Sequence, residues 1–376
     1  MRSAVSAVAP VMRSAVSAAA LVAATMVAAT LLAAVLLTAA VLAIPGIGSA
    51  HAAPAPQTAK DLCLGRAASP DQRMAGCTAL IDAKTETSRT LAMAFCNRGY
   101  LLNEQKQYDT ALVDLNAGIK ADPTYACLYV NRGRAYDFLH DPDKAIADYD
   151  EALRLDPNFV LAYNNRGVVW RDKGDLDQAL ADFGMAIRID PKYVRAYANR
   201  AEVYRKRGDT QHGIDDMTTV IALRPSVEAF LDRGNAYRDL NQLDRAAADY
   251  SVIVKNAPGD ARGWRNRGLV RLMKNDDAGA IADYNQAIKL DPDDADSYNN
   301  RGMAFRKRKQ LDKASADFDT ALRLDPKLAI VHVNRGAVLE DKGDRTAALA
   351  AYHAALALEP AFKPALDNLA KMGAKQ

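Results

Sequence analysis

Histidine is scarce in this sequence, with five copies among 376 residues, and no two of them stand at the spacing of a zinc-binding helix. None is paired with a cysteine at metal-ligand spacing either. The glycine-rich fragment Gly46-Ile47-Gly48 lacks the third glycine that a phosphate-binding loop needs. We therefore expect no metal site and no cofactor.

Charge is absent from Ser14 to Ile44, an apolar run that two arginines precede. This pattern and the small-residue site Ala50-His51-Ala52 predict an export signal over residues 1–52. The run also exceeds the roughly 20 residues that span a bilayer, so an uncleaved membrane anchor is the alternative. In both cases the remainder faces the periplasm or is secreted, and contact with a membrane is expected only for the anchor. Residues 53–60, rich in alanine and proline, are predicted to be a disordered tether.

An Asn-Arg-Gly triplet recurs along the chain, with one Asn-Arg-Ala and one Asp-Arg-Gly variant. The triplets begin at positions 97, 131, 165, 199, 232, 266, 300 and 334, so their spacing is constant except for one step that is shorter by a single position. A series of prolines keeps the same spacing and the same single deletion, at positions 123, 157, 191, 225, 258, 292, 326 and 360. Two independent markers with one period predict eight repeats over residues 92–361.

Each repeat is predicted to form two helices. Between Val160 and Lys192, two apolar stretches with helical spacing are separated by Lys173-Gly174-Asp175, in which the glycine stops one helix and the aspartate caps the next. Such pairs bury their apolar faces only against neighbours, and the two ends of the stack need caps. The prediction is an all-α solenoid, with a lone capping helix at Asp71–Ala83 within residues 61–91 and a C-terminal one within residues 362–376.

These repeats resemble the tetratricopeptide repeat (TPR), whose pattern contains a bulky residue, a small one, an aromatic, alanine, an aromatic, alanine and proline. In the second unit these are Tyr129, Gly133, Tyr136, Ala145, Tyr149, Ala152 and Pro157. The resemblance implies a right-handed superhelical solenoid of eight helix-turn-helix TPR units. Unit four departs from it, with Ala201 in place of glycine and Gly213 in place of alanine, and the short step follows. We expect an irregular joint there.

The arginine of the triplet has a possible partner in the second helix. Seven units carry an aspartate there, at positions 114, 148, 182, 216, 249, 283 and 317, whereas the last unit has Ala351. We expect structural Arg–Asp pairs, formed either within or between units. Because carboxylates that recur in every unit do not form a unique acid–base pair, we expect no catalytic residues and no enzyme activity.

In the TPR family the first helices line a concave surface that holds protein or peptide ligands. The resemblance places one row of polar residues on that surface: Asn97, Asn131, Asn165, Asn199, Asp232, Asn266, Asn300 and Asn334. A carboxamide can bond both the C=O and the N–H of a peptide unit, so this row is predicted to grip the backbone of an extended segment. The alternative is that each asparagine bonds the neighbouring repeat.

Arginines are expected on the same surface, at Arg195, Arg205, Arg238, Arg262, Arg265 and Arg306. They favour a partner with an acidic stretch or a free C-terminal carboxylate, although a charge-mixed, solvated surface is the alternative. Loss of residues 1–52 lowers the formal net charge from +3 to +1, which argues against nucleic acid. The sequence thus predicts a protein-binding scaffold of the cell envelope, with an accessory of cell-wall or glycan processing as the alternative.

The four cysteines are Cys63, Cys77, Cys96 and Cys127, and none of them forms a C-x-x-C pair. An even number in an exported chain favours disulfides over metal ligands. A Cys63–Cys77 bond would fix the loop ahead of the N-terminal capping helix, and Cys96 and Cys127 lie at neighbouring inner positions. The connectivity stays open at this point, as does the alternative of free thiols.

Overall fold

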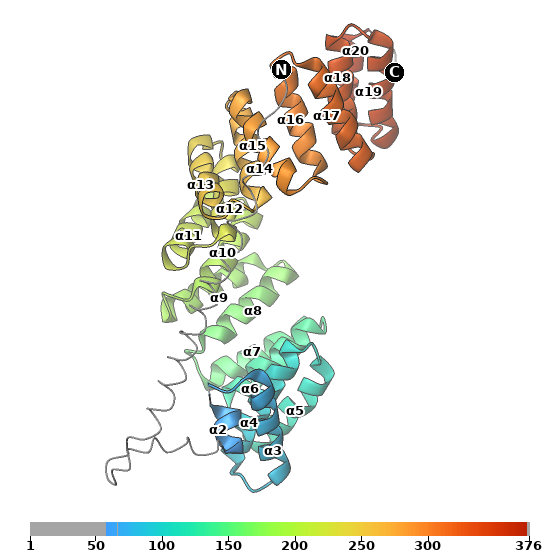
Figure 1. The fold of residues 1–376 in the computed structure, drawn as a ribbon. Coiled ribbons are helices and arrows are strands. Elements are labelled where there is room, and N and C mark those ends of the chain that lie inside the picture. Colours follow the sequence, from blue (N-terminus) through green and yellow to red (C-terminus); the bar gives the residue numbers. More distant parts are fainter. Residues whose placement is uncertain (1–57, 66, 374–376) are drawn as a thin grey trace, which may run out of the picture. The chain divides into compact units, whose positions relative to one another are not determined.

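The computed structural model describes residues 58–65 and 67–373, and every regular element in these ranges is a helix (Figure 1). The predicted export signal at residues 1–52 lies outside the described residues, as do positions 53–57 of the expected tether and the last three residues. The first described helix begins at Ala59, inside the stretch expected as a tether. None of the described helices is both long and apolar enough to cross a membrane.

The described helices form two caps and a series of pairs. The N-terminal cap consists of α2 (Ala59–Leu64) and α3 (Pro70–Ala83), and α20 (Lys363–Lys371) closes the other end. The pairs between them are α4 (Ser88–Glu104) with α5 (Tyr108–Ala121), α6 (Ala126–Phe138) with α7 (Pro142–Leu155), α8 (Val160–Lys173) with α9 (Leu176–Ile189), α10 (Val194–Arg207) with α11 (Thr210–Leu223), α12 (Val227–Asp239) with α13 (Leu243–Asn256), α14 (Ala261–Met273) with α15 (Asp277–Leu290), α16 (Ala295–Lys307) with α17 (Leu311–Leu324), and α18 (Ala329–Asp341) with α19 (Arg345–Leu358).

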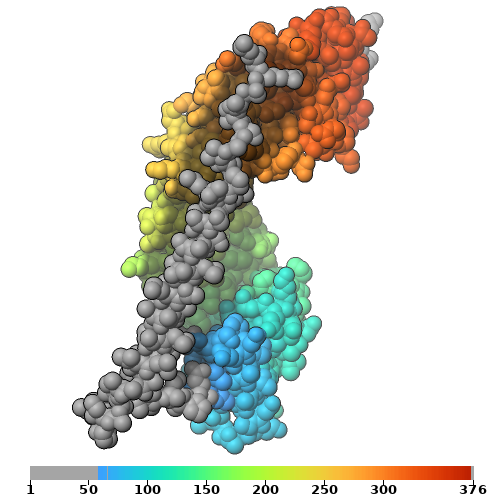
Figure 2. Space-filling model, viewed as in Figure 1, coloured from blue at the N-terminus to red at the C-terminus, as the bar shows by residue number. Residues whose placement is uncertain are grey.

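Each pair is one repeat, numbered here as units one to eight. The two helices of a unit pack against each other, and the second helix packs against the first helix of the next unit. In Figure 2 the colours accordingly follow one another in sequence order through the described residues. Buried residues form a series of small clusters along the stack. This arrangement is the all-α solenoid that the sequence period predicts.

The turn inside unit three illustrates how the sequence sets the helix boundaries. Gly174 ends α8 in the left-handed conformation with φ 87°, where a residue without Cβ has no steric penalty. The side chain of Asp175 then accepts a hydrogen bond from the backbone N–H of Gln178 and caps α9. Both predicted boundaries of this turn are confirmed.

The triplet glycine lets the two helices of a unit approach closely, because a side chain of the second helix occupies the space beside it. In six units this is a buried or nearly buried aromatic ring, namely Tyr149, Phe183, Tyr250, Tyr284, Phe318 or Tyr352. A Cβ placed on Gly234 would lie 2.7 Å from Cε1 of Tyr250. Unit four has Ala201 and Met217 at the two corresponding positions. Alanine is slightly larger than the glycine of the other units, and methionine is smaller than their rings.

Replacing Gly234 by alanine is expected to lower the free energy of unfolding by about 1–3 kcal/mol, because the new methyl group overlaps the Tyr250 ring. Gly184 in α9 is the matched control, since nothing lies within 4 Å of a Cβ built there. Gly184→Ala should instead raise the free energy of unfolding by about 0.5–1 kcal/mol through helix propensity. Urea denaturation of the two variants measures both changes, and equal effects would contradict this account of the packing.

All four cysteines lie in described residues and form two disulfides. Cys63 in α2 is bonded to Cys77 in α3, with the Cα atoms 4.5 Å apart. Cys96 in α4 is bonded to Cys127 in α6, across the first helices of units one and two, with the Cα atoms 6.4 Å apart. The expectation of disulfides is confirmed, and both bonds lie at the N-terminal end of the stack.

Candidate functional site

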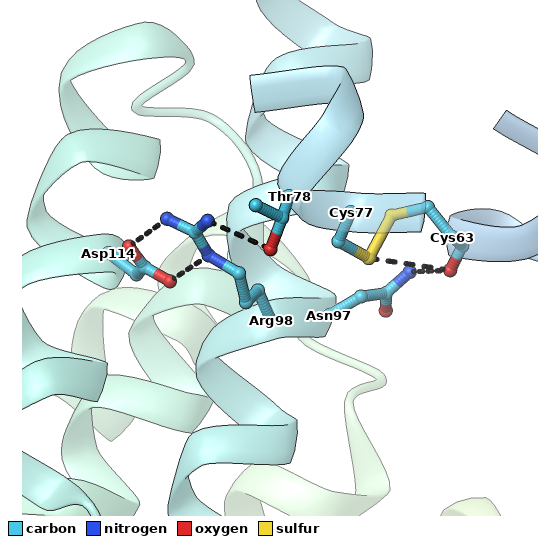
Figure 3. The surroundings of a disulfide bond; sticks show 6 residues. All are labelled: Cys63, Cys77, Thr78, Asn97, Arg98 and Asp114. Atoms are coloured by element: carbon cyan, nitrogen blue, oxygen red, sulfur yellow. Dashed lines mark hydrogen bonds and ion pairs between the residues drawn. A yellow bond between two sulfur atoms is a disulfide. The ribbon is translucent and has the colours of Figure 1, made fainter. Parts of the chain in front are cut away.

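The triplet arginines pair with the second-helix aspartates of their own units. In unit one, Arg98 Nε donates to one carboxylate oxygen of Asp114 at 2.6 Å, and Nη2 donates to the other at 2.7 Å (Figure 3). The same two-pronged contact recurs in units two to seven, from Arg132 to Asp148 through Arg301 to Asp317. The predicted pairs therefore form within units, and their aspartates are buried.

The same arginines also reach the preceding unit. The third guanidinium nitrogen bonds a side chain on the previous second helix, as from Arg132 to Asn116 at 2.7 Å and from Arg301 to Asn285 at 2.8 Å. In the last unit, where Ala351 replaces the aspartate, Arg335 turns to Asp319 of the preceding unit at 2.7 Å. In units one to three and five to seven the arginine thus joins its own pair of helices to the preceding unit or cap, which is a structural role. Among the described residues Arg200 of unit four bonds Asp216 alone.

Burial disfavours the ionised form of these carboxylates. It raises the pKa of Asp148 and of Asp182 above the ordinary value for aspartate, although the Arg132 and Arg166 guanidinium groups lower it. The net stabilisation from such a pair is therefore small, whereas removal of one partner strands a partly buried charge.

The predicted polar row lies on the first helices, as expected. These helices also form the more closely spaced side of the stack, because neighbouring first helices contact each other over much of its length. Asn131 is buried, the other six asparagines are partly buried, and Asp232 is exposed.

Several members of the row already bond the preceding unit, or the N-terminal cap, through Nδ2. Asn97 donates to the backbone oxygen of Cys63 at 3.1 Å (Figure 3), and Asn131 donates to that of Cys96 at 3.3 Å. Asn199 and Asn334 donate instead to the side chains of Asn164 and Asn299, each at 2.9 Å. The remaining asparagines bond locally: Asn266 donates to the backbone oxygen of Arg262, while Asn165 and Asn300 accept from the preceding residue.

Most of the predicted arginine stripe is paired with acids. Ion pairs join Arg238 to Asp239, Arg262 to Asp260 and Glu228, Arg265 to Asp294, and Arg306 to Asp341. Within the described residues Arg195 and Arg205 form no ion pair, and both are exposed. Both belong to α10, so the arginines of this stripe that form no ion pair lie in unit four.

A cavity of about 600 Å³ opens beside Arg205, between unit four and α12 of unit five. Ala198, Ala201, Gly213, Met217 and Ala236 supply its apolar lining. Its polar lining comes from Asn199, Glu202, Arg205, Thr210, Asp232, Asn235, Arg238 and Asp239. The volume falls within the range of about 300–1,000 Å³ that is typical of pockets for small ligands.

The cavity gathers four positions at which unit four and the start of unit five depart from the repeat pattern. Ala201 replaces the triplet glycine, Gly213 replaces alanine, Met217 replaces the ring, and Asp232 replaces asparagine. The one shortened step of the repeat falls between the last two of these positions. The joint expected at unit four thus coincides with a cavity that these substituted positions line.

Models of the tetratricopeptide repeat match residues 130–194, 198–261, 231–295 and 295–328. These matches together span more than half of the chain. The chain belongs to the tetratricopeptide-repeat family. A fold of this family serves as a scaffold for contacts between proteins, and TPR proteins typically bind protein or peptide partners.

The chain is similar to several solved structures. A tetratricopeptide repeat protein from Parabacteroides merdae is 21% identical, with a TM-score of 0.50 over 65% of this chain and 96% of that one. Pseudomonas aeruginosa pilF is 17% identical, with a TM-score of 0.48 over 56% of this chain and 97% of its own. YrrB, described as a TPR protein with an unusual peptide-binding site, is 18% identical, with a TM-score of 0.38 over 58% of this chain and 96% of its own. No curated protein matches the sequence.

Sequence reasoning missed two features of the site. Met217 and Asn235 line the cavity, yet neither is among the residues predicted for the site. The signal for Met217 is present in the sequence, because it stands in the register of the six aromatic residues and breaks their series. Asn235 carries no such signal.

Proposed function

We propose that this TPR chain is a non-catalytic scaffold of the cell envelope that holds an extended segment of a partner protein along its first helices. The observation that carries the proposal is the row of carboxamides. Four of them use Nδ2 to bond the preceding unit or cap, and within the described residues no donor bonds Oδ1 of Asn199 or Asn334. Such a side chain is held in place by one end and offers an acceptor at the other.

The row is therefore proposed to accept N–H groups of the partner backbone. An extended chain advances about 3.3 Å per residue, while packed helices lie about 8–10 Å apart, so one amide would meet about every third peptide unit. Selectivity is assigned to unit four, where Arg195 and Arg205 favour an acidic stretch or a C-terminal carboxylate on the partner. The paired arginines contribute little to such a preference.

The envelope setting is supported by the disulfides and by the sequence of the predicted export signal. Disulfides persist in oxidising compartments outside the cytoplasm. The export pattern supports a location of the repeats in the periplasm or in the medium, with a membrane anchor as the alternative if the segment is retained.

Joint replacement of Asn165, Asn199 and Asn266 by alanine is expected to reduce recovery of cross-linked partners at least about tenfold, because three backbone-gripping amides worth about 0.5–1.5 kcal/mol each are lost. The measurement is a cross-linking pull-down from the native envelope. The matched control replaces Asn158, Asn256 and Asn368, which lie outside the row. Circular dichroism checks that both variants keep the native helix content. Undiminished recovery by the row variant would exclude the proposed grip.

A further inference from the structure

The cavity at the junction of units four and five can be understood by comparison with the packing inside the regular units. In units two, three and five to eight, the second helix places an aromatic ring against the triplet glycine. In unit four the equivalent residue is Met217, which is smaller than tyrosine or phenylalanine, and Gly213 lacks the methyl group of the alanine found there in most other units. Unit one also has no ring at this position, but there Leu115 fills the space beside Gly99. The cavity lies at the other unit without a ring, where Met217 and Gly213 line it.

The first helices beside the cavity are also more widely spaced than elsewhere in the stack. First helices contact their neighbours from α4 to α10 and again from α14 to α18, whereas α10, α12 and α14 approach one another less closely. The cavity lies between α10, α11 and α12, on the side of the proposed groove. A side chain of a bound segment can reach it without a change in the fold.

We propose that this cavity receives an aromatic side chain of the bound partner, with tyrosine preferred over phenylalanine, an inference whose biological meaning rests on the proposed scaffold function. The guest ring would take the place that Tyr149 or Tyr284 occupies in regular units. The hydroxyls of those tyrosines lie beside Asn165 and Asn300 of the next unit, and Asp232 holds the corresponding position here. A carboxylate accepts a hydrogen bond from a phenol strongly.

The charges around the cavity favour a neutral guest with a polar tip. Glu202, Asp232 and Asp239 line the cavity together with Arg205 and Arg238, so neither an anionic nor a cationic side chain finds a single-sign surface. Asp239 and Arg238 already pair with each other. Asp232 has no hydrogen bond or ion pair within the described residues, so it is the acceptor best placed for a phenol. The Arg205 guanidinium can lie against a ring face.

The first test fills the cavity with a side chain of the protein itself. The variant Ala201→Gly/Met217→Tyr restores the glycine and ring of a regular unit. We expect it to bind p-cresol at least about tenfold more weakly than the native chain, because its own ring occupies the site. It should also melt at a higher temperature. Phe318→Tyr in unit seven adds the same hydroxyl to a regular unit and should leave p-cresol binding unchanged.

The second test concerns the hydroxyl and uses Asp232→Asn, which keeps the shape of an exposed side chain. Ligand-observed NMR on the purified chain with both disulfides intact compares p-cresol, toluene and butylamine. The native chain should prefer p-cresol over toluene by about tenfold or more, and the Asp232→Asn variant should lose most of that preference.

The outcomes separate this inference from the proposed function. Equal p-cresol binding by the native chain and the refilled variant overturns the pocket, as does stronger binding of butylamine than of p-cresol. If the variant without the asparagine row still recovers its partners, the proposed binding of the partner backbone by this row is wrong. That result does not affect the proposal that the cavity binds p-cresol. The small probes need no partner, so the two results are independent.

Discussion

Replacing Asp148 by alanine is expected to lower the free energy of unfolding by about 3–5 kcal/mol, because the change strands the Arg132 guanidinium between two packed units. Asp148 is 5% exposed and accepts from Arg132 at 2.8 and 2.7 Å. The remaining partner of Arg132 is the neutral side chain of Asn116. Urea denaturation followed by circular dichroism measures the loss.

Asp150 supplies the matched control on the same helix. It pairs with Arg166, but its side chain is 56% exposed and Arg166 keeps Asp182 when it is removed. Asp150→Ala should therefore cost less than about 1 kcal/mol. The double variant Arg132→Met/Asp148→Leu should recover most of the stability, since a packed apolar pair avoids the cost of burying charge. Equal losses from Asp148→Ala and Asp150→Ala would show that burial of the pair is unimportant.

Removing the first disulfide with Cys63→Ala/Cys77→Ala is expected to cost about 3 kcal/mol at the N-terminal end, from the closure of a short loop. Helix α2 has six residues, too few to be stable alone. It is held by the bond to α3 and by the hydrogen bond from Asn97 to the backbone oxygen of Cys63. Loss of the bond should therefore release α2 and leave the Asn97 amide without its acceptor.

Hydrogen exchange locates this effect. Amides of residues 59–64 should lose protection in the double variant, while those of α16 to α19 should keep native rates, because repeats influence mainly their neighbours. Protection of α2 that persists after loss of the bond would mean that packing alone holds the cap. Uniform loss along the chain would mean that the stack unfolds as one unit.

The fold followed from the sequence because two markers repeat with one period, and each repeat contains its own stop and cap signals. The Arg–Asp pairing was foreseeable, but the choice between pairing within and between units was not. The aspartate lies 16 residues after the arginine, and another polar residue often lies 16 before it, as Asn116 does for Arg132. The arginine uses both neighbours, so neither alternative was complete.

Less of the site than of the fold could be predicted from the sequence. Every arginine of the stripe was identified, yet four of the six are paired, and some partners belong to a different unit, as Glu228 does for Arg262. Residue type predicts charge but not which acids packing brings alongside it. The departures of unit four were also evident, but their convergence on one cavity depends on how far α10 and α12 stand apart.

The two ends of the solenoid are secured differently. Both disulfides lie in the cap and the first two units, whereas α20 is held to α19 by noncovalent packing of residues such as Ala365 and Leu369. Unfolding should therefore begin at the C-terminal end of the stack and proceed toward the disulfide-bonded N-terminal end. The groove would then be lost one repeat at a time, and the junction of units four and five would outlast the last three units.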